Sequence, residues 1–90
     1  MFRNGQWILF PGDIPGAQKS KDGLIVGIYC AAGVNALGAK RPAEIHVVSK
    51  GKGETIAKLD PEAITGIQAL TDKADLPKDR PVDPAWMPQP

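Results

Sequence analysis

The chain has 90 residues, enough for one small domain, and its 11 Lys and Arg against 10 Asp and Glu leave a net charge of +1. The single cysteine, Cys30, excludes an internal disulfide framework, and no apolar run reaches the roughly 20 residues of a membrane helix. A hydrophobic content of 42% predicts a folded body, and 10 Gly and 9 Pro favour short strands and turns. With one cysteine and no membrane helix, the chain is expected to be soluble and intracellular, without a membrane partner.

The first two predicted strands lie on either side of an irregular loop. Gln6–Phe10 has aromatic and β-branched residues between Asn-Gly and Pro-Gly turn signals. Residues 11–23 contain two Pro-Gly steps and end in Asp-Gly, a tight-turn signal. Residues 24–31 are the most apolar run in the chain, so we expect a central strand that is shielded on both faces. Gly27 in its middle predicts a bulge or a sharp bend.

Residues 43–59 have the pattern of a β-hairpin. Two β-branched runs flank the glycine-rich, basic tip at residues 50–53. Strand alternation predicts that Ile45 and Val47 point inward with Ala43, and that His46 points outward.

Three shorter segments surround this hairpin. Residues 32–42, with two glycines and many small side chains, predict either a mobile loop or an exposed ribbon. Asp60 and Pro61 provide an N-cap and an N1 proline, so a short helical turn is expected there, ending at Gly66. Residues 67–70 are expected to form a fifth strand that pairs back on the barrel.

The composition changes beyond residue 71, where five of the nine prolines fall within the last fourteen residues. Proline excludes both helix and inner strand, so the segment is expected to be extended and polyproline-like. Trp86 and Met87 near its end are either a latch on the chain's own barrel or an anchor for another subunit. We favour the anchor, because the proline-rich linker can reach a neighbour. The predicted organisation is therefore a small β-barrel domain at 1–71 and an extended arm at 72–90.

No group of residues predicts catalysis, a metal or a cofactor. His46 has no second ligand at metal-binding spacing, so we expect an ordinary surface residue, with a pH-sensitive or partner contact as the alternative. Cys30 has apolar neighbours and is expected to be a small buried hydrophobe, with an exposed thiol or an intermolecular disulfide as the alternative. The acids beyond residue 71 lie in a proline-broken segment that holds no pair at a fixed distance. An enzyme is therefore the least favoured class.

The basic residues are concentrated in the first part of the chain. Residues 1–59 carry eight Lys and Arg against four acids, and residues 60–90 carry three against six. Lys50 and Lys52 alternate with glycines, but a strand and not a helix is expected to follow them, so the segment does not match a phosphate-binding P-loop. We favour a solvated turn. The alternative is contact with a nucleic-acid backbone, helped by Lys40 and Arg41 and by Lys19 and Lys21.

Several of these patterns occur together in a family of small proteins. They are Gly5-Gln6-Trp7-Ile8, Val26-Gly27-Ile28, Ala43-Glu44-Ile45-His46-Val47-Val48, and Leu76-Pro77-Lys78-Asp79-Arg80-Pro81. In this respect the chain resembles small proteins that tailed bacteriophages of Gram-negative hosts encode among their virion assembly genes. The sequence departs from their pattern in the 11–23 loop, the 33–42 insertion and the Trp86-Met87 ending.

The residues and the resemblance together define the expected protein. The fold is mainly β, a small SH3-like five-stranded barrel with one short helical turn and an extended Pro-rich C-terminal arm. The resemblance implies a non-enzymatic virion structural protein without cofactors, located in the virion and, during assembly, in the host cytoplasm. Its partners would be many copies of capsid or connector subunits. The alternatives are a small nucleic-acid-binding barrel and an inhibitor of a host defence or polymerase. The expected partner-binding residues are Trp86, Met87, Arg80, Lys40, Arg41, Lys50 and Lys52.

Overall fold

A computed structural model describes residues 2–34, 37–51 and 54–71, and this part of the chain is mainly β. Its elements in chain order are β1 (Gln6–Phe10), β2 (Ile25–Cys30), β3 (Gly33–Val34), β4 (Lys40–Arg41), β5 (Glu44–Val48), β6 (Thr55–Leu59), the 3-10 turn η1 (Pro61–Ala63) and β7 (Gln68–Ala69). No helix in the described ranges is long and apolar enough to cross a membrane. The arm predicted at 72–90 lies outside the described residues.

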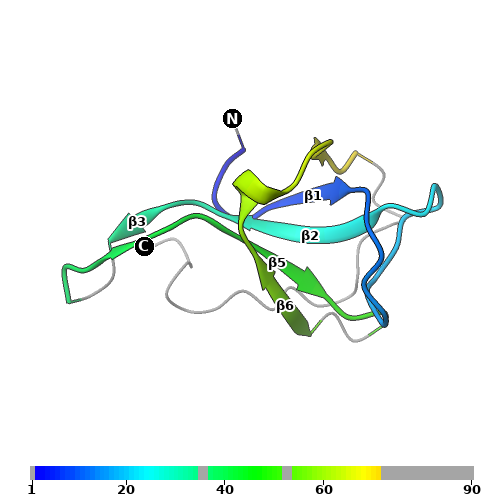
Figure 1. The fold of residues 1–90 in the computed structure, drawn as a ribbon, viewed down its shortest axis with the longest axis horizontal. Helices are drawn as coiled ribbons and strands as arrows, with labels where there is room; N and C mark the ends of the chain where they lie inside the picture. Colours follow the sequence, from blue (N-terminus) through cyan, green and yellow to red (C-terminus); the bar gives the residue numbers. More distant parts are fainter. Residues whose placement is uncertain (1, 35–36, 52–53, 72–90) are drawn as a thin grey trace.

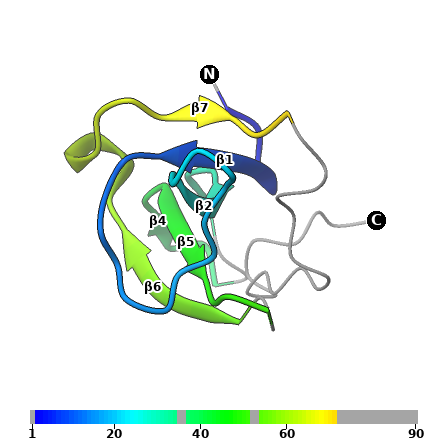
Figure 2. The same cartoon turned by 90° about the vertical axis from the view of Figure 1, so that its right-hand side faces the viewer.

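Five of the strands form one antiparallel sheet in the order β6-β5-β2-β1-β7. The sheet is strongly curved when viewed along its strands (Figure 2). β6 and β7 are its outer strands, and β7 pairs through two residues with β1. The predicted number of five strands, with a last strand at residues 67–70 that pairs back on the others, is therefore confirmed, whereas a closed barrel is not found among the described residues.

The remaining two strands make a small ribbon. β3 pairs with β4 through Gly33 with Arg41 and Val34 with Lys40. Figure 1 shows this ribbon extending away from the five-stranded sheet, beyond the ends of β2 and β5. Of the two structures predicted for residues 32–42, the exposed ribbon is the one that the described residues adopt.

The three inner strands carry apolar side chains on both faces. The first core cluster is built from Ile8, Phe10, Ala17, Ile25, Ile45 and Val47. The second core cluster is built from Leu9, Val26, Ile28, Cys30 and Val48. Since successive strand residues point to opposite faces, the two clusters lie on opposite sides of the sheet. The prediction that β2 is shielded on both faces is confirmed, as is the buried position of Cys30.

The prediction that His46 is a surface residue is wrong. Its exposed fraction is 1%, and it shares a sheet face with Val48 in the second core cluster. The prediction assumed that one face of the hairpin at residues 43–59 is exposed to solvent. In the sheet, β5 lies between β2 and β6, and the face that carries His46 is buried as well.

Of the bulge or sharp bend predicted at Gly27, the bulge is not found. Pairing runs without a register shift from Gln6 opposite Tyr29 to Phe10 opposite Ile25, and the shift occurs in the hairpin, between Val47 and Val48. A Cβ atom at Gly27 would lie 2.9 Å from Cγ2 of Ile45. Close packing of the first core cluster therefore explains this glycine.

The turn η1 begins as predicted and ends earlier. The Asp60 carboxylate accepts a hydrogen bond from the Glu62 backbone N–H at 3.0 Å, and Pro61 occupies the first turn. The turn stops at Ala63, so Gly66 is not its C-terminal residue. Gly66 instead has a φ of 77° in the connection to β7. A Cβ there would lie 3.2 Å from the Pro11 ring, so the connection packs closely on the first loop.

Candidate functional site

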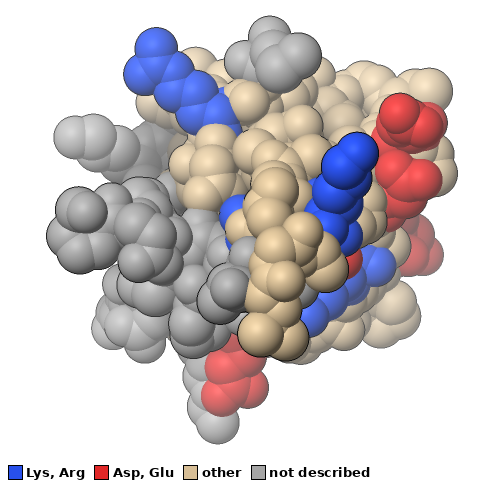
Figure 3. Space-filling view, turned by 90° about the vertical axis from the view of Figure 1, so that its left-hand side faces the viewer, with Lys and Arg blue, Asp and Glu red and all other residues tan. Residues whose placement is uncertain are grey.

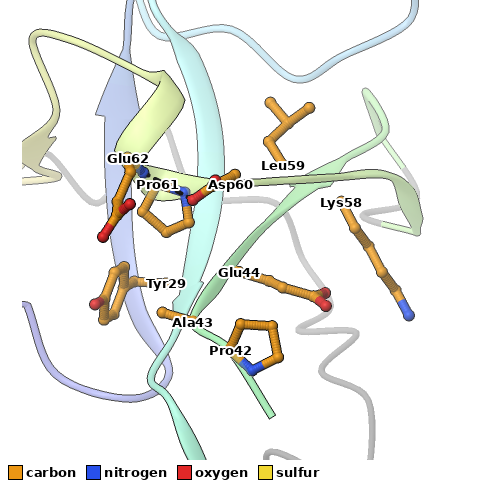
Figure 4. Close-up of a pocket in the computed structure, with 9 residues that line it drawn as sticks. All are labelled: Tyr29, Pro42, Ala43, Glu44, Lys58, Leu59, Asp60, Pro61 and Glu62. Atoms are coloured by element: carbon orange, nitrogen blue, oxygen red, sulfur yellow. Dashed lines mark hydrogen bonds between the residues drawn. The ribbon is translucent and has the colours of Figure 1, made fainter.

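A pocket of about 490 Å³ lies where β6 runs into η1. Its lining residues are Tyr29, Pro42, Ala43, Glu44, Lys58, Leu59, Asp60, Pro61 and Glu62. In Figure 4, Tyr29 and Glu62 lie on one side of this pocket and Glu44 and Lys58 on the other. No local sequence pattern marks this pocket, because its walls come from β2, β5, β6 and η1, which only the folded sheet brings together.

Each polar wall of the pocket has a local cause. The N-cap of η1 turns the chain after Leu59 and places Glu62 above Tyr29. The Tyr29 ring also packs on Phe2, with 5.7 Å between ring centroids. Glu44 opens β5, and its Oε2 lies 3.1 Å from Nε2 of His46. Because the Glu44 side chain is 26% exposed and His46 is buried, this contact joins the pocket wall to the buried interior of the sheet.

The chemistry of the pocket suits a peptide better than a phosphate. The charged side chains in the lining are three carboxylates, those of Glu44, Asp60 and Glu62, and a single ammonium group, that of Lys58. A phosphate would meet net repulsion there. The tyrosine ring and the two prolines provide apolar walls, as in grooves that bind extended peptides. Within the described ranges, no group of three or more His, Cys, Asp or Glu side chains is placed to hold a metal ion.

The ribbon β3–β4 is the second candidate surface. Val34 is 61% exposed and Leu37, at the turn between its strands, is 93% exposed. Lys40 is exposed on β4, whereas Arg41 is half-buried and its guanidinium lies against Gly33. Sequence reasoning selected the two basic residues here and missed the two apolar ones. Their position in a glycine-rich segment, where no core residue is expected, was the available signal.

The structure does not bring the predicted basic residues together. Lys40 and Arg41 lie on the ribbon, and Lys50 lies in the turn after β5, at the opposite end of that strand. On the face shown in Figure 3, tan surface interrupts the Lys and Arg side chains, and acidic side chains gather at one edge. The other expected contact residues, Lys52, Arg80, Trp86 and Met87, lie outside the described residues.

Comparison of the chain with known protein families, curated proteins and solved structures gave no match.

Proposed function

We propose that this chain is a non-enzymatic structural protein that acts through protein–protein contacts, as a component of a tailed-bacteriophage virion with an SH3-like body. The observation that carries the proposal is the projecting ribbon with its exposed apolar side chains. The curved five-stranded antiparallel sheet supports the SH3-like comparison, and the resemblance to phage assembly proteins supports the virion context.

The ribbon has few pairing interactions of its own and exposes large apolar side chains. A two-stranded ribbon of two residues per strand is marginally stable in water by itself. It nevertheless exposes Val34 and Leu37 to solvent, and Lys40, which pairs with Val34, is exposed as well. An apolar centre with a polar rim is typical of surfaces that a partner covers. Ile56, the other large exposed apolar residue of the described chain, is alone on β6 and only 42% exposed.

In this function, each contact between a ribbon and its partner is weak, and many identical contacts in one particle raise the overall avidity. A particle presents the same partner surface many times, and closed symmetry places copies of this chain at equal spacing. Each ribbon then needs to bury only a small apolar area, because neighbouring contacts raise the effective concentration of the next one. The pocket beside Tyr29 offers a second contact surface on the same body.

The experiment is quantitative mass spectrometry of purified phage particles. Wild-type chain is expected in the particles in many copies, and Leu37→Ser is expected to reduce its incorporation about tenfold, since it removes an apolar contact worth about 1.4 kcal/mol. Ile56→Ser is the matched control, because it removes an exposed apolar side chain from the sheet and leaves the ribbon intact. Circular dichroism should show unchanged β structure for both variants.

Absence of the wild-type chain from particles would refute the proposal. The nucleic-acid alternative predicts a different result: the purified protein would bind DNA with an affinity that falls steeply with salt and drops when Lys50 is replaced by Ala.

A further inference from the structure

The ribbon β3–β4 carries apolar and cationic side chains together. Val34 and Lys40 are paired across the ribbon, so their side chains share one of its faces, and both are exposed. The other face is covered at Gly33 by the Arg41 guanidinium, which has a nitrogen 3.1 Å from the position of an added Cβ. Leu37, at the turn between the strands, adds a second exposed apolar side chain. The exposed face of the ribbon therefore suits a partner surface that is both apolar and anionic.

The pocket beside Tyr29 is such a surface. Its three carboxylates against one ammonium group leave it with net negative charge. The Asp60 carboxylate caps η1, and that of Glu44 contacts His46. Glu62 is exposed, and its backbone and not its side chain takes part in the cap, so its carboxylate can meet a cation from another molecule. The Tyr29 ring and the two prolines of the lining supply apolar walls close to this carboxylate (Figure 4).

We propose that a second copy of this chain occupies the pocket with its ribbon, so that Lys40 of one copy lies opposite Glu62 of the other. The inference rests on the proposed function, because it takes the ribbon as the contact surface and names the partner. Within one chain the ribbon does not fill the pocket, since it extends away from the sheet (Figure 1). A second copy supplies the apolar and the cationic side chains together, at the spacing that the ribbon fixes.

The position of the pocket allows the contact to be reciprocal. Pro42 and Ala43 connect the ribbon to β5 and also line the pocket, so the pocket lies at the base of the ribbon. Leu37 lies five residues before Pro42. At about 3.3 Å per strand residue, this separates the tip from the base by roughly 17 Å. Two copies related by a two-fold axis can lay their ribbons side by side, so that each tip reaches the base of the other. Every substitution in such an interface acts twice.

Sedimentation equilibrium of the purified full-length chain measures this contact. Wild type is expected to dimerise reversibly. Lys40→Glu is expected to raise the Kd at least about tenfold, because it places like charges opposite each other at two equivalent contacts. Glu62→Lys should have the same effect, and the double variant, in which both charges are reversed, should restore the wild-type Kd. Lys50→Glu is the matched control, because it makes the same charge change at an exposed lysine beyond the other end of β5, and it should leave the Kd unchanged.

A cross-linking measurement needs no variant and covers the case in which a substituted chain fails to fold. Wild-type chain is mixed in equal amounts with chain labelled with ¹⁵N, and a carbodiimide is added, which joins an ammonium group to a carboxylate in direct contact. Mass spectrometry is expected to find peptides that join Lys40 to Glu62 with one labelled and one unlabelled partner. Such mixed peptides form only between two chains.

Three results would overturn the inference: a monomeric mass at concentrations up to about 1 mM, folded single variants that dimerise like wild type, or a double variant that does not restore the dimer. Cross-links between Lys40 and Glu62 that carry one isotope only would overturn it as well. A monomer that is present in particles in many copies would remove this inference and leave the proposed function standing. A dimer that is absent from particles would do the reverse.

Discussion

Replacing Gly27 by Ala tests how tightly the centre of the sheet is packed. The added Cβ would lie 2.9 Å from Cγ2 of Ile45, 3.3 Å from the His46 carbonyl oxygen and 3.4 Å from the Phe10 ring. The first of these distances is shorter than real Cβ contacts, and the second is to backbone. Ile45 and Phe10 are both buried and belong to the first core cluster, so a shift of either side chain disturbs the packing of that cluster.

The expected cost follows from two opposing effects. An extra methyl in a packed core typically destabilises a protein by about 1–3 kcal/mol. Replacing glycine by alanine restricts the unfolded chain and offsets about 0.4–1 kcal/mol of that cost. We therefore expect Gly27→Ala to lower the free energy of unfolding by about 1–2 kcal/mol. For a domain of this size, that corresponds to a fall in Tm of about 4–16 °C.

Urea unfolding followed by circular dichroism measures this change, with an m value equal to that of wild type. Gly33→Ala is the control: its Cβ would meet the flexible end of Arg41, at 3.1 Å from a guanidinium nitrogen, and should change stability by less than about 0.5 kcal/mol. Combining Gly27→Ala with Ile45→Ala should show a favourable coupling of at least about 0.5 kcal/mol, because the new methyl partly fills the space that isoleucine leaves. Wild-type stability for Gly27→Ala, or strict additivity in the double variant, would show that the close approach does not govern this position.

Two further predictions concern His46 and the turn η1. His46→Ala should lower the free energy of unfolding by about 2–4 kcal/mol in the same urea assay, because it leaves a cavity at a buried site and removes the hydrogen-bond partner of Glu44. A cost below about 0.5 kcal/mol would instead indicate that His46 lies at the surface. Asp60→Ala should cost about 0.5–1 kcal/mol, because the exposed N-cap loses its bond to the Glu62 N–H. Glu62→Gln is the matched control and should leave stability unchanged, because the backbone N–H of residue 62, and not its side chain, makes the capping hydrogen bond. Equal effects of the two substitutions would argue against Asp60 as the N-cap.

Local signals in the sequence predicted most of the described elements. β1, β2, the β5–β6 hairpin and the start of η1 each have their cause within a few residues: β-branched runs, Pro-Gly and Asp-Gly turns, and the Asp60-Pro61 cap. Such signals act through backbone preferences and nearby hydrogen bonds, so they can be recognised without the fold. The burial of Cys30 also followed from its apolar neighbours.

The candidate surfaces were less predictable, because they depend on which strands become neighbours. The pocket joins Tyr29 of β2 to Glu44 of β5 and Glu62 of η1, and no local pattern places these three together. The basic side chains were predicted as contact residues, but Lys40 on β4 precedes β5 and Lys50 follows it, so the length of β5 separates the two. Val34 and Leu37 belong to a segment that projects from the sheet, and their exposure depends on that tertiary arrangement.

The sequence by itself determined where most of the strands and the turn η1 begin, since those choices depend on short-range sterics and capping. The tertiary structure decided the environment of each residue. It made His46 an interior residue, because β5 lies between two strands in a sheet with apolar clusters on both faces. It likewise gave Gly27 its role, because the missing side chain matters through Ile45 and Phe10, which come from other strands. Burial and close packing are properties of contacts between distant segments, and only the folded sheet brings those segments together.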